Sequence, residues 1–187
     1  MEGIYFRANN ASLEVTKRIN NFLKFDLDQK ASILNIGSDK TLEEVLGPLV
    51  GTLLQENNLP VTSYGSLTNP IIVDDLEEVP SPVIVVSSKT TDEKENIGNI
   101  IIKRGAIELG IEPSHKYDTV SVYGLVGNDF SGFSFAMIRE MAKTIKAGLK
   151  QVVMEYLYAD AYFNPKKKKS SEKIVNFLEY KINNTFQ

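Results

Sequence analysis

ILNIGSDKTLEEVLGPLVGTLL, residues 33–54, is the stretch of this sequence that says most about the fold. A short apolar run ends at Gly37, a polar segment follows it, and the chain then becomes amphipathic. This order predicts a buried strand over residues 31–37 and, after it, a helix over residues 42–57 with one broad apolar face.

Strands and helices are expected to alternate along the rest of the chain. The patterns predict helices over residues 11–25 and 135–158, and strands over residues 61–64, 82–88 and 117–127. A strand–helix–strand order is typical of an α/β fold in which a mainly parallel, twisted sheet lies between helices on both faces. The piece from Asn99 to Leu125 is expected to be a local antiparallel excursion from that sheet.

The chain length of 187 residues predicts a single α/β domain over residues 1–164. Residues 165–187 are expected to be an addition, in which a lysine-rich linker, PKKKKSSEK, leads into a C-terminal helix. Because no aromatic residues interrupt the lysines, we expect a solvated linker rather than a nucleic-acid or lipid site. The C-terminal helix either packs on the domain or binds a partner.

The charge and the composition argue against several classes of function. A formal net charge of -3 and a pI near 5.3 give no reason to expect nucleic acid as a partner. The sequence has no cysteine, which excludes disulfides, thiol nucleophiles and thiolate metal sites. The first residues do not resemble a signal peptide, and no apolar run reaches the roughly 18 residues of a membrane helix. We therefore expect a cytoplasmic protein without membrane association.

The motifs predict no cofactor and no metal. Neither of the glycine-rich motifs that bind dinucleotides or nucleotide phosphates occurs near Gly37. The single histidine, His115, rules out a zinc site with two or three histidines. We expect His115 in a solvated loop, because no G-x-S-x-G elbow accompanies it to make a serine triad.

The acidic residues after the first strand have two interpretations. Asp39 and Glu44 could share a cleft as an acid/base pair, because their mutual repulsion would keep one of them protonated. Alternatively, Thr41 and Glu44 form a capping box that begins the helix, where acidic residues also suit the helix dipole. A helix that begins at Thr41 would lose an internal hydrogen bond at Pro48, whereas a helix that begins at Gly47 would have the proline in its first turn.

Two strand ends are expected to form a ligand crevice. In an open α/β sheet the crevice lies beyond the carboxyl ends of the strands. The first strand ends at residues 37–39 and the central strand ends at residues 87–89. If these strands are neighbours, their loops border one crevice, with Glu43 and Glu44 at its rim.

Three segments resemble a known protein family. NIGSDKTLEEVLGPLVGTLL, YGSLTNPI and VYGLVGNDFSGF are similar to the sporulation protein family YyaC, and LGPLVGT is the most specific part. That family is similar to the spore germination protease and, more remotely, to the hydrogenase maturation proteases. The resemblance covers about residues 31–155. It implies a phosphorylase/hydrolase-like three-layer sandwich, and it implies a location in the mother cell or forespore of a spore-forming bacterium.

For the germination protease, the resemblance implies peptidase activity on small acid-soluble spore proteins, carried by two aspartates. In this sequence Glu44 occupies the first position, just before the L-G-P motif, and Ser87 occupies the second, at the end of the central strand. The glutamate moves the carboxylate by one methylene, and the serine removes the partner that a two-acid mechanism needs. The candidate catalytic residues are Asp39, Glu44 and Ser87. Asp74 or Asp75 would substitute if their turn borders the crevice.

Three functions remain open from the sequence. The chain is a catalytically degraded relative that binds another protein, an active peptidase-like hydrolase with an acidic pair, or a small-ligand-binding protein. The first expects Glu44 to cap the helix, and the third expects a formed pocket above Gly37 and Ser87. The expected partners are another protein or the small acid-soluble spore proteins. Self-association into a homo-oligomer is also expected, with apolar surface from the long helix that begins at Phe135 and from the C-terminal helix.

Overall fold

The computed structural model describes residues 3–23, 32–57, 59, 61–72, 83–105, 119–128 and 133–163. The strands are β1 (Ile4–Tyr5), β2 (Ser32–Asn35), β3 (Thr62–Tyr64), β4 (Val83–Thr91), β5 (Asn99–Arg104) and β6 (Val120–Gly127). The α-helices are α1 (Ala11–Phe22), α2 (Leu46–Gln55) and α3 (Phe135–Phe163), and a short 3-10 turn spans Lys94–Asn96.

The strands form one six-stranded mixed sheet in the order β1-β5-β6-β4-β2-β3. The pairs β3–β2, β2–β4 and β4–β6 are parallel, and β5 is antiparallel to both β6 and β1. The predicted α/β fold with a mainly parallel sheet is therefore confirmed. The antiparallel excursion predicted from Asn99 to Leu125 is confirmed for β5, which runs antiparallel to β6. It is wrong for residues 120–125, because β6 pairs in parallel with β4.

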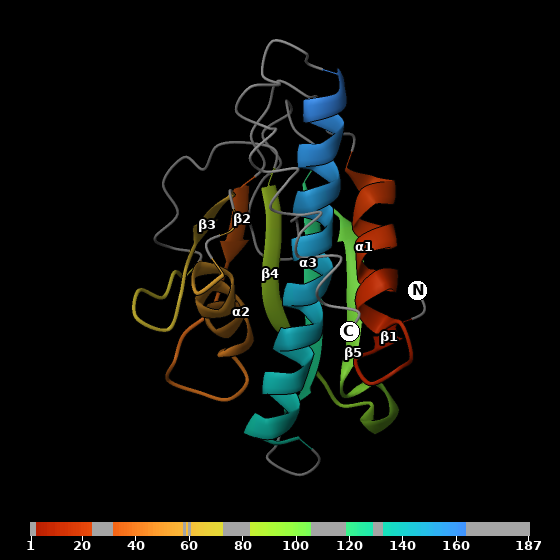
Figure 1. Ribbon diagram of the computed structural model, residues 1–187. Helices are drawn as coiled ribbons and strands as arrows, with labels where there is room; N and C mark the ends of the chain where they lie inside the picture. Colours follow the sequence, from red (N-terminus) through yellow and green to blue (C-terminus); the bar gives the residue numbers. More distant parts are fainter. Residues whose placement is uncertain are drawn as a thin grey trace, which may run out of the picture.

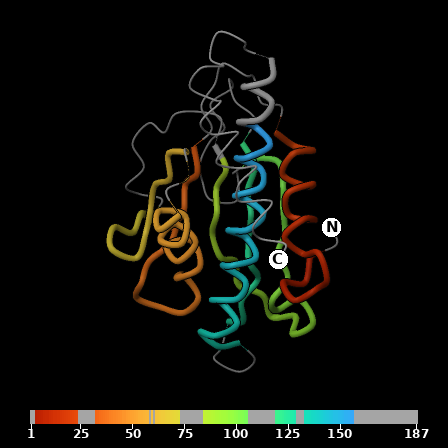
Figure 2. Tube along the Cα trace, in the orientation of Figure 1, coloured from red at the N-terminus to blue at the C-terminus, as the bar shows by residue number. Residues whose placement is uncertain are grey.

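The edge strand β1 was not predicted from the sequence. Ile4 pairs with Ile100 and Tyr5 pairs with Asn99, so the start of the chain lies beside β5 (Figure 2). Two residues are too few to show a strand periodicity, and only the pairing with β5 defines them as a strand.

The three described α-helices lie on one face of the sheet (Figure 1). α3 runs over the middle of the sheet between α1 and α2 and contacts both. Its buried side chains recur at helical spacing, as predicted, at Ile138, Met141, Ala142, Ile145, Leu149, Val152 and Val153. The apolar stripe of α3 is thus part of the core, and self-association through other residues of this helix stays a prediction. Phe135 is the exception, because it is 49% exposed.

The central strands are buried on both faces, as parallel strands usually are. Ile33 and Ile84 belong to the core under the helices. Their neighbours Leu34 and Val85 face the other way, pair with each other, and are only 2% and 1% exposed. A second helical layer on that other face stays a prediction, because the described α-helices all lie on the first.

The helix after β2 begins later than a capping box would place it. α2 begins at Leu46, and its N-cap residue Val45 makes no side-chain cap hydrogen bond. The interpretation of Glu44 as a capping residue is therefore wrong. Pro48 gives the physical reason, because it is the third helical residue, where an N–H has no partner within the helix. A start at Thr41 would have placed the proline ring against a helical carbonyl.

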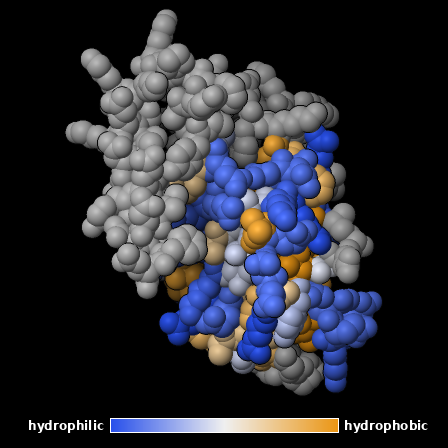
Figure 3. All heavy atoms as spheres, turned by 45° about the vertical axis from the view of Figure 1, so that its right-hand side comes forward, coloured by the Kyte–Doolittle hydropathy of each residue, from blue (hydrophilic) through white to orange (hydrophobic). Residues whose placement is uncertain are grey.

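The outer surface that includes α1 is mostly hydrophilic. Figure 3 turns this side forward and shows a hydrophilic surface with small apolar spots. Leu13 and Tyr5, which are 36% and 45% exposed, are among the large apolar side chains at the described surface. Among the described helices, none combines the length and the apolar character that crossing a bilayer requires.

Several predicted features fall outside the described part of the chain. They are His115, Asp74, Asp75, and the lysine-rich linker and C-terminal helix of residues 165–187.

Candidate functional site

Two glycines let α2 lie directly against the ends of β2 and β3. A Cβ atom on Gly47 would lie 2.2 Å from the carbonyl oxygen of Ile36, and one on Gly51 would lie 1.8 Å from the carbonyl oxygen of Gly65. Both contacts are with backbone, which cannot move aside as a side chain can. The LGPLVG sequence thus fixes the first turns of α2 at the carboxyl edge of the sheet.

The chain leaves β2 at Gly37, whose φ of +147° suits glycine. The Ile36 amide donates to the Val86 carbonyl at 2.8 Å, and the Gly37 amide donates to the Ile71 carbonyl at 2.9 Å. A Cβ atom on Gly37 would lie 2.0 Å from the carbonyl oxygen of Glu44. The turn that precedes α2 therefore folds back over the end of β2.

A hydrogen bond holds the Glu44 side chain across this turn. The Ser38 hydroxyl donates to the Glu44 carboxylate and accepts a hydrogen bond from the Lys40 amide at 3.3 Å. Ser38 is only 6% exposed, whereas Glu44 is exposed. The serine thus anchors one carboxylate oxygen of an exposed side chain.

A pocket of about 460 Å³ lies at the carboxyl ends of β2 and β4. We call it the strand-end pocket. The described residues that line it are Ile36, Gly37, Glu43, Glu44, Ile72, Ser87, Ser88, Lys89, Thr90 and Tyr123. Because β2 and β4 are parallel neighbours, the crevice expected between their ends is present. A formed pocket above Gly37 and Ser87 is what the ligand-binding interpretation expected.

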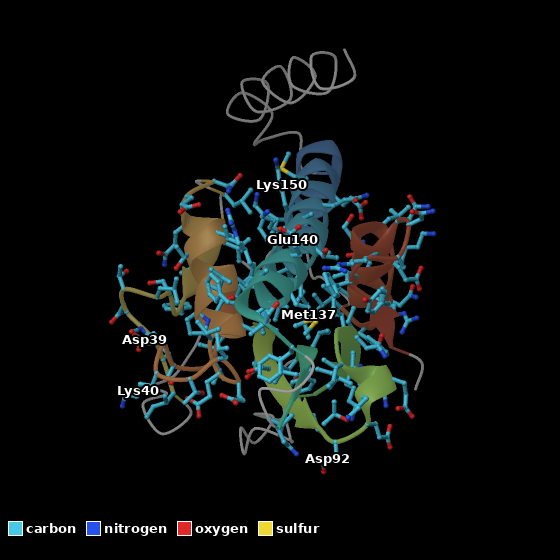
Figure 4. All side chains as sticks on the ribbon, turned by 90° about the horizontal axis from the view of Figure 1, so that it is seen from below. Asp39, Lys40, Asp92, Met137, Glu140 and Lys150 are labelled. Carbon is cyan, nitrogen blue, oxygen red and sulfur yellow. The ribbon has the colours of Figure 1, made fainter. Side chains whose placement is uncertain are left out.

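Of the three candidate catalytic residues, the structure brings two together. Glu44, in the turn between β2 and α2, and Ser87, in the middle of β4, both line the strand-end pocket. The prediction that the central strand ends at residues 87–89 is wrong, because β4 continues to Thr91. Asp39 is exposed, does not line the pocket, and lies with Lys40 at the periphery of the turn (Figure 4). The Ser87 hydroxyl donates to the Ser88 carbonyl at 3.3 Å, an interaction within its own strand. Catalytic roles for Asp39, Glu44 and Ser87 stay predictions.

The sequence reasoning missed Tyr123 as a pocket residue. Tyr123 pairs with Ser87 in the register of β4 and β6, so both side chains extend from the same face of the sheet. Tyr123 is the aromatic residue of β6. That signal would have pointed to the pocket only if β6 had been placed beside β4.

The Tyr123 hydroxyl is a buried group without a partner. Tyr123 is 2% exposed, and its hydroxyl finds no hydrogen-bond partner within the described structure. Buried polar groups are normally satisfied by protein, water or a bound ion, so this one calls for an explanation.

We expect Tyr123→Phe to stabilise the protein free of ligand by about 1 kcal/mol, because the change removes a buried hydroxyl that none of the described residues satisfies. Urea denaturation of the two proteins measures the difference in the free energy of unfolding. Ser121→Ala is the control. Ser121 is in β6 like Tyr123, but its hydroxyl donates a hydrogen bond to the Gly105 carbonyl at 2.5 Å. Loss of this hydrogen bond should destabilise the protein. Destabilisation by Tyr123→Phe would show that the hydroxyl has a partner in the folded chain.

The described residues offer no built metal site, because they contain no group of three or more His, Cys, Asp or Glu side chains that could hold an ion. The polar groups of the pocket are carboxylates, hydroxyls and one lysine. Such a set can bind and orient a ligand by hydrogen bonds and charge.

The fold and the pocket together define an α/β protein with a ligand crevice at the carboxyl ends of its parallel strands. The family described as "Protein of unknown function (DUF1256)" matches residues 4–148, and the chain belongs to that family. The resemblance to the YyaC family is consistent with this membership. The match includes α1 as well as the strands and helices around the pocket.

Comparisons with other known proteins add one solved structure. None of the curated proteins matches the chain. The NiFe hydrogenase maturation protease HybD from Thermococcus kodakarensis is similar at 11% identity, over 66% of this chain and 99% of that chain, with a TM-score of 0.44. A similarity at this level assigns neither an activity nor a residue role to the present chain.

Proposed function

We propose that this chain is a sporulation-associated binding protein, which holds a segment of a partner protein in the strand-end pocket without hydrolysing it. The link to sporulation rests on the resemblance of residues 31–155 to the YyaC family. The same resemblance makes the small acid-soluble spore proteins the partner to test first. The location in the mother cell or forespore is part of the same proposal.

The observation that carries the proposal is the chemistry of the two sides of the strand-end pocket. The turn after β2 presents Glu44, whose carboxylate is anchored by Ser38, and β4 presents Ser87 instead of a second acid. The two-acid mechanism that the resemblance implies needs a carboxylate at both of these positions, close enough to share a proton. Among the described residues, the only other carboxylate in the pocket is Glu43, which comes from the same turn as Glu44.

Peptide hydrolysis is the second candidate function. It is favoured by the presence of two carboxylates, Glu43 and Glu44, in one pocket, because a shared cleft is the usual setting for an acidic pair. In that case Glu43 would replace Asp39 as the partner of Glu44.

An assay of cleavage separates the two functions. The purified chain is incubated with small acid-soluble spore proteins, and their masses are followed beside the variants Asp39→Ala, Glu43→Gln and Glu44→Gln. We expect intact substrate with all four proteins. Cleavage by the unmodified chain that disappears in Glu43→Gln or Glu44→Gln would contradict the proposal and establish the acidic pair.

Self-association is a separate part of the proposal. Since the apolar stripe of α3 is buried, a homo-oligomer would have to use another surface, such as the one around Phe135. Sedimentation of the full chain beside Phe135→Ser measures this directly.

A further inference from the structure

We propose that the strand-end pocket binds the basic side chain, lysine or arginine, of a segment of the partner protein. This inference rests on the proposed function and names the chemical group that the pocket recognises. Three features of the pocket support it: apolar walls, an excess of carboxylates and an unsatisfied hydroxyl.

The apolar walls suit the aliphatic stem of a long basic side chain. Ile36, Ile72 and the ring of Tyr123 contribute to the lining. Ile72 is 44% exposed, so part of its apolar surface remains in water while the pocket is empty. Lysine and arginine bury their methylene stems against such surface and keep the charged end in a polar environment.

The charged groups of the pocket favour a cation. Glu43 and Glu44 contribute two carboxylates to the lining and Lys89 contributes one ammonium group, so the described charges sum to a negative value. Lys89 has an interaction of its own within the fold. Hydrogen bonds between a cationic donor and a carboxylate are about twice as strong as neutral ones. An anionic ligand would instead meet both glutamates.

The Tyr123 hydroxyl is the independent sign that the pocket takes a ligand. It is buried, it has no partner among the described residues, and its side chain forms part of the pocket lining. Lysine and arginine carry only donors, whereas a phenolic hydroxyl can accept a hydrogen bond. A bound ammonium or guanidinium group would therefore supply the partner that the described residues do not.

Calorimetric titration of the full chain with capped pentapeptides tests this inference. The peptides have alanine on both sides of a central lysine, arginine, norleucine or glutamate. We expect the lysine and arginine peptides to bind about tenfold more tightly than the norleucine peptide, which has the stem without the charge. The glutamate peptide should bind more weakly still, and the preference for lysine should decrease at high salt.

Matched variants assign the preference to the pocket. Glu43→Gln and Tyr123→Phe should each weaken binding of the lysine peptide by about tenfold. Glu140→Gln is the control, because it removes the same charge from an exposed site on α3. Thermal unfolding of each variant confirms that it is folded before its affinity is compared.

Three outcomes would overturn the inference. The first is that the lysine peptide shows no measurable binding, and the second is that the norleucine peptide binds as tightly as the lysine peptide. The third is that Glu43→Gln and Glu140→Gln change the affinity for the lysine peptide equally. These failures differ from failure of the proposed function, which would appear as cleavage of the spore proteins. A chain that binds the spore proteins intact but shows no preference for lysine would keep the function and lose the inference.

Discussion

Replacing Gly51 with alanine is expected to destabilise the protein by about 3 kcal/mol, the upper end of the usual cost of overpacking a core. The added methyl would lie 1.8 Å from the carbonyl oxygen of Gly65. Relief of this contact requires α2 to move away from β3 or Gly65 to move. Gly65 has a φ of +79°, and its own Cβ position lies 2.1 Å from the Asn35 carbonyl oxygen, so it cannot shift freely toward β2.

The sign of the change in the free energy of unfolding tests whether the close contact exists. In a helix without the close contact, Gly→Ala would stabilise the protein by up to about 1 kcal/mol through helix propensity. Urea denaturation of Gly51→Ala measures the free energy of unfolding. Gln55→Ala, at an exposed position of the same helix, is the control and should change it by less than about 0.5 kcal/mol. A neutral or stabilised Gly51→Ala protein would mean that α2 does not lie against the backbone at this point.

Asn35→Asp is expected to have a comparable or larger effect, about 3 to 5 kcal/mol, because it leaves a buried charge without compensation. The Asn35 side chain is 0% exposed, and its amide nitrogen donates to the Tyr64 carbonyl at 2.8 Å and to Ser63 Oγ at 3.0 Å. An aspartate has no donor for the Tyr64 carbonyl, and one of its carboxylate oxygens would lie next to the Tyr64 carbonyl oxygen and be repelled by it. This side chain joins β2 to β3, so its loss should loosen the edge of the sheet.

Thermal and urea unfolding of Asn35→Asp beside Ser63→Ala separate the charge from the hydrogen bond. Ser63→Ala removes one acceptor of the same amide and should cost about 1 kcal/mol. If Asn35→Asp cost no more than Ser63→Ala, the amide would not hold the two strands together as described.

Much of the fold could be predicted because the local signals agree with it. The apolar run before Gly37 and the β-branched run after Pro82 became β2 and β4, and the periodicity from Phe135 became α3, which begins at that residue. The start of α2 could not be fixed, because a helical pattern and a capping-box pattern overlap over residues 41–48. Pro48 favours the later start, but the closed turn at Gly37, where a Cβ atom would lie 2.0 Å from the Glu44 carbonyl oxygen, exists only in the folded chain.

The site could be predicted in part for a similar reason. Glu44 and Ser87 were found because strand ends in α/β sheets border crevices, and the pairing of β2 with β4 places them together. Nearness in sequence predicts Asp39 as a partner of Glu44, but Asp39 does not line the pocket. Tyr123 was missed because its position depends on the pairing of β4 with β6, which the sequence alone does not reveal.

The most direct test of the central claim is hydrogen exchange of the full chain with and without small acid-soluble spore protein, read by mass spectrometry. The claim predicts protection of the amides in residues 36–44 and 87–90, which border the strand-end pocket, while the spore protein keeps its intact mass. Fragments of the spore protein, or protection confined to the opposite side of the molecule around α1, would contradict it.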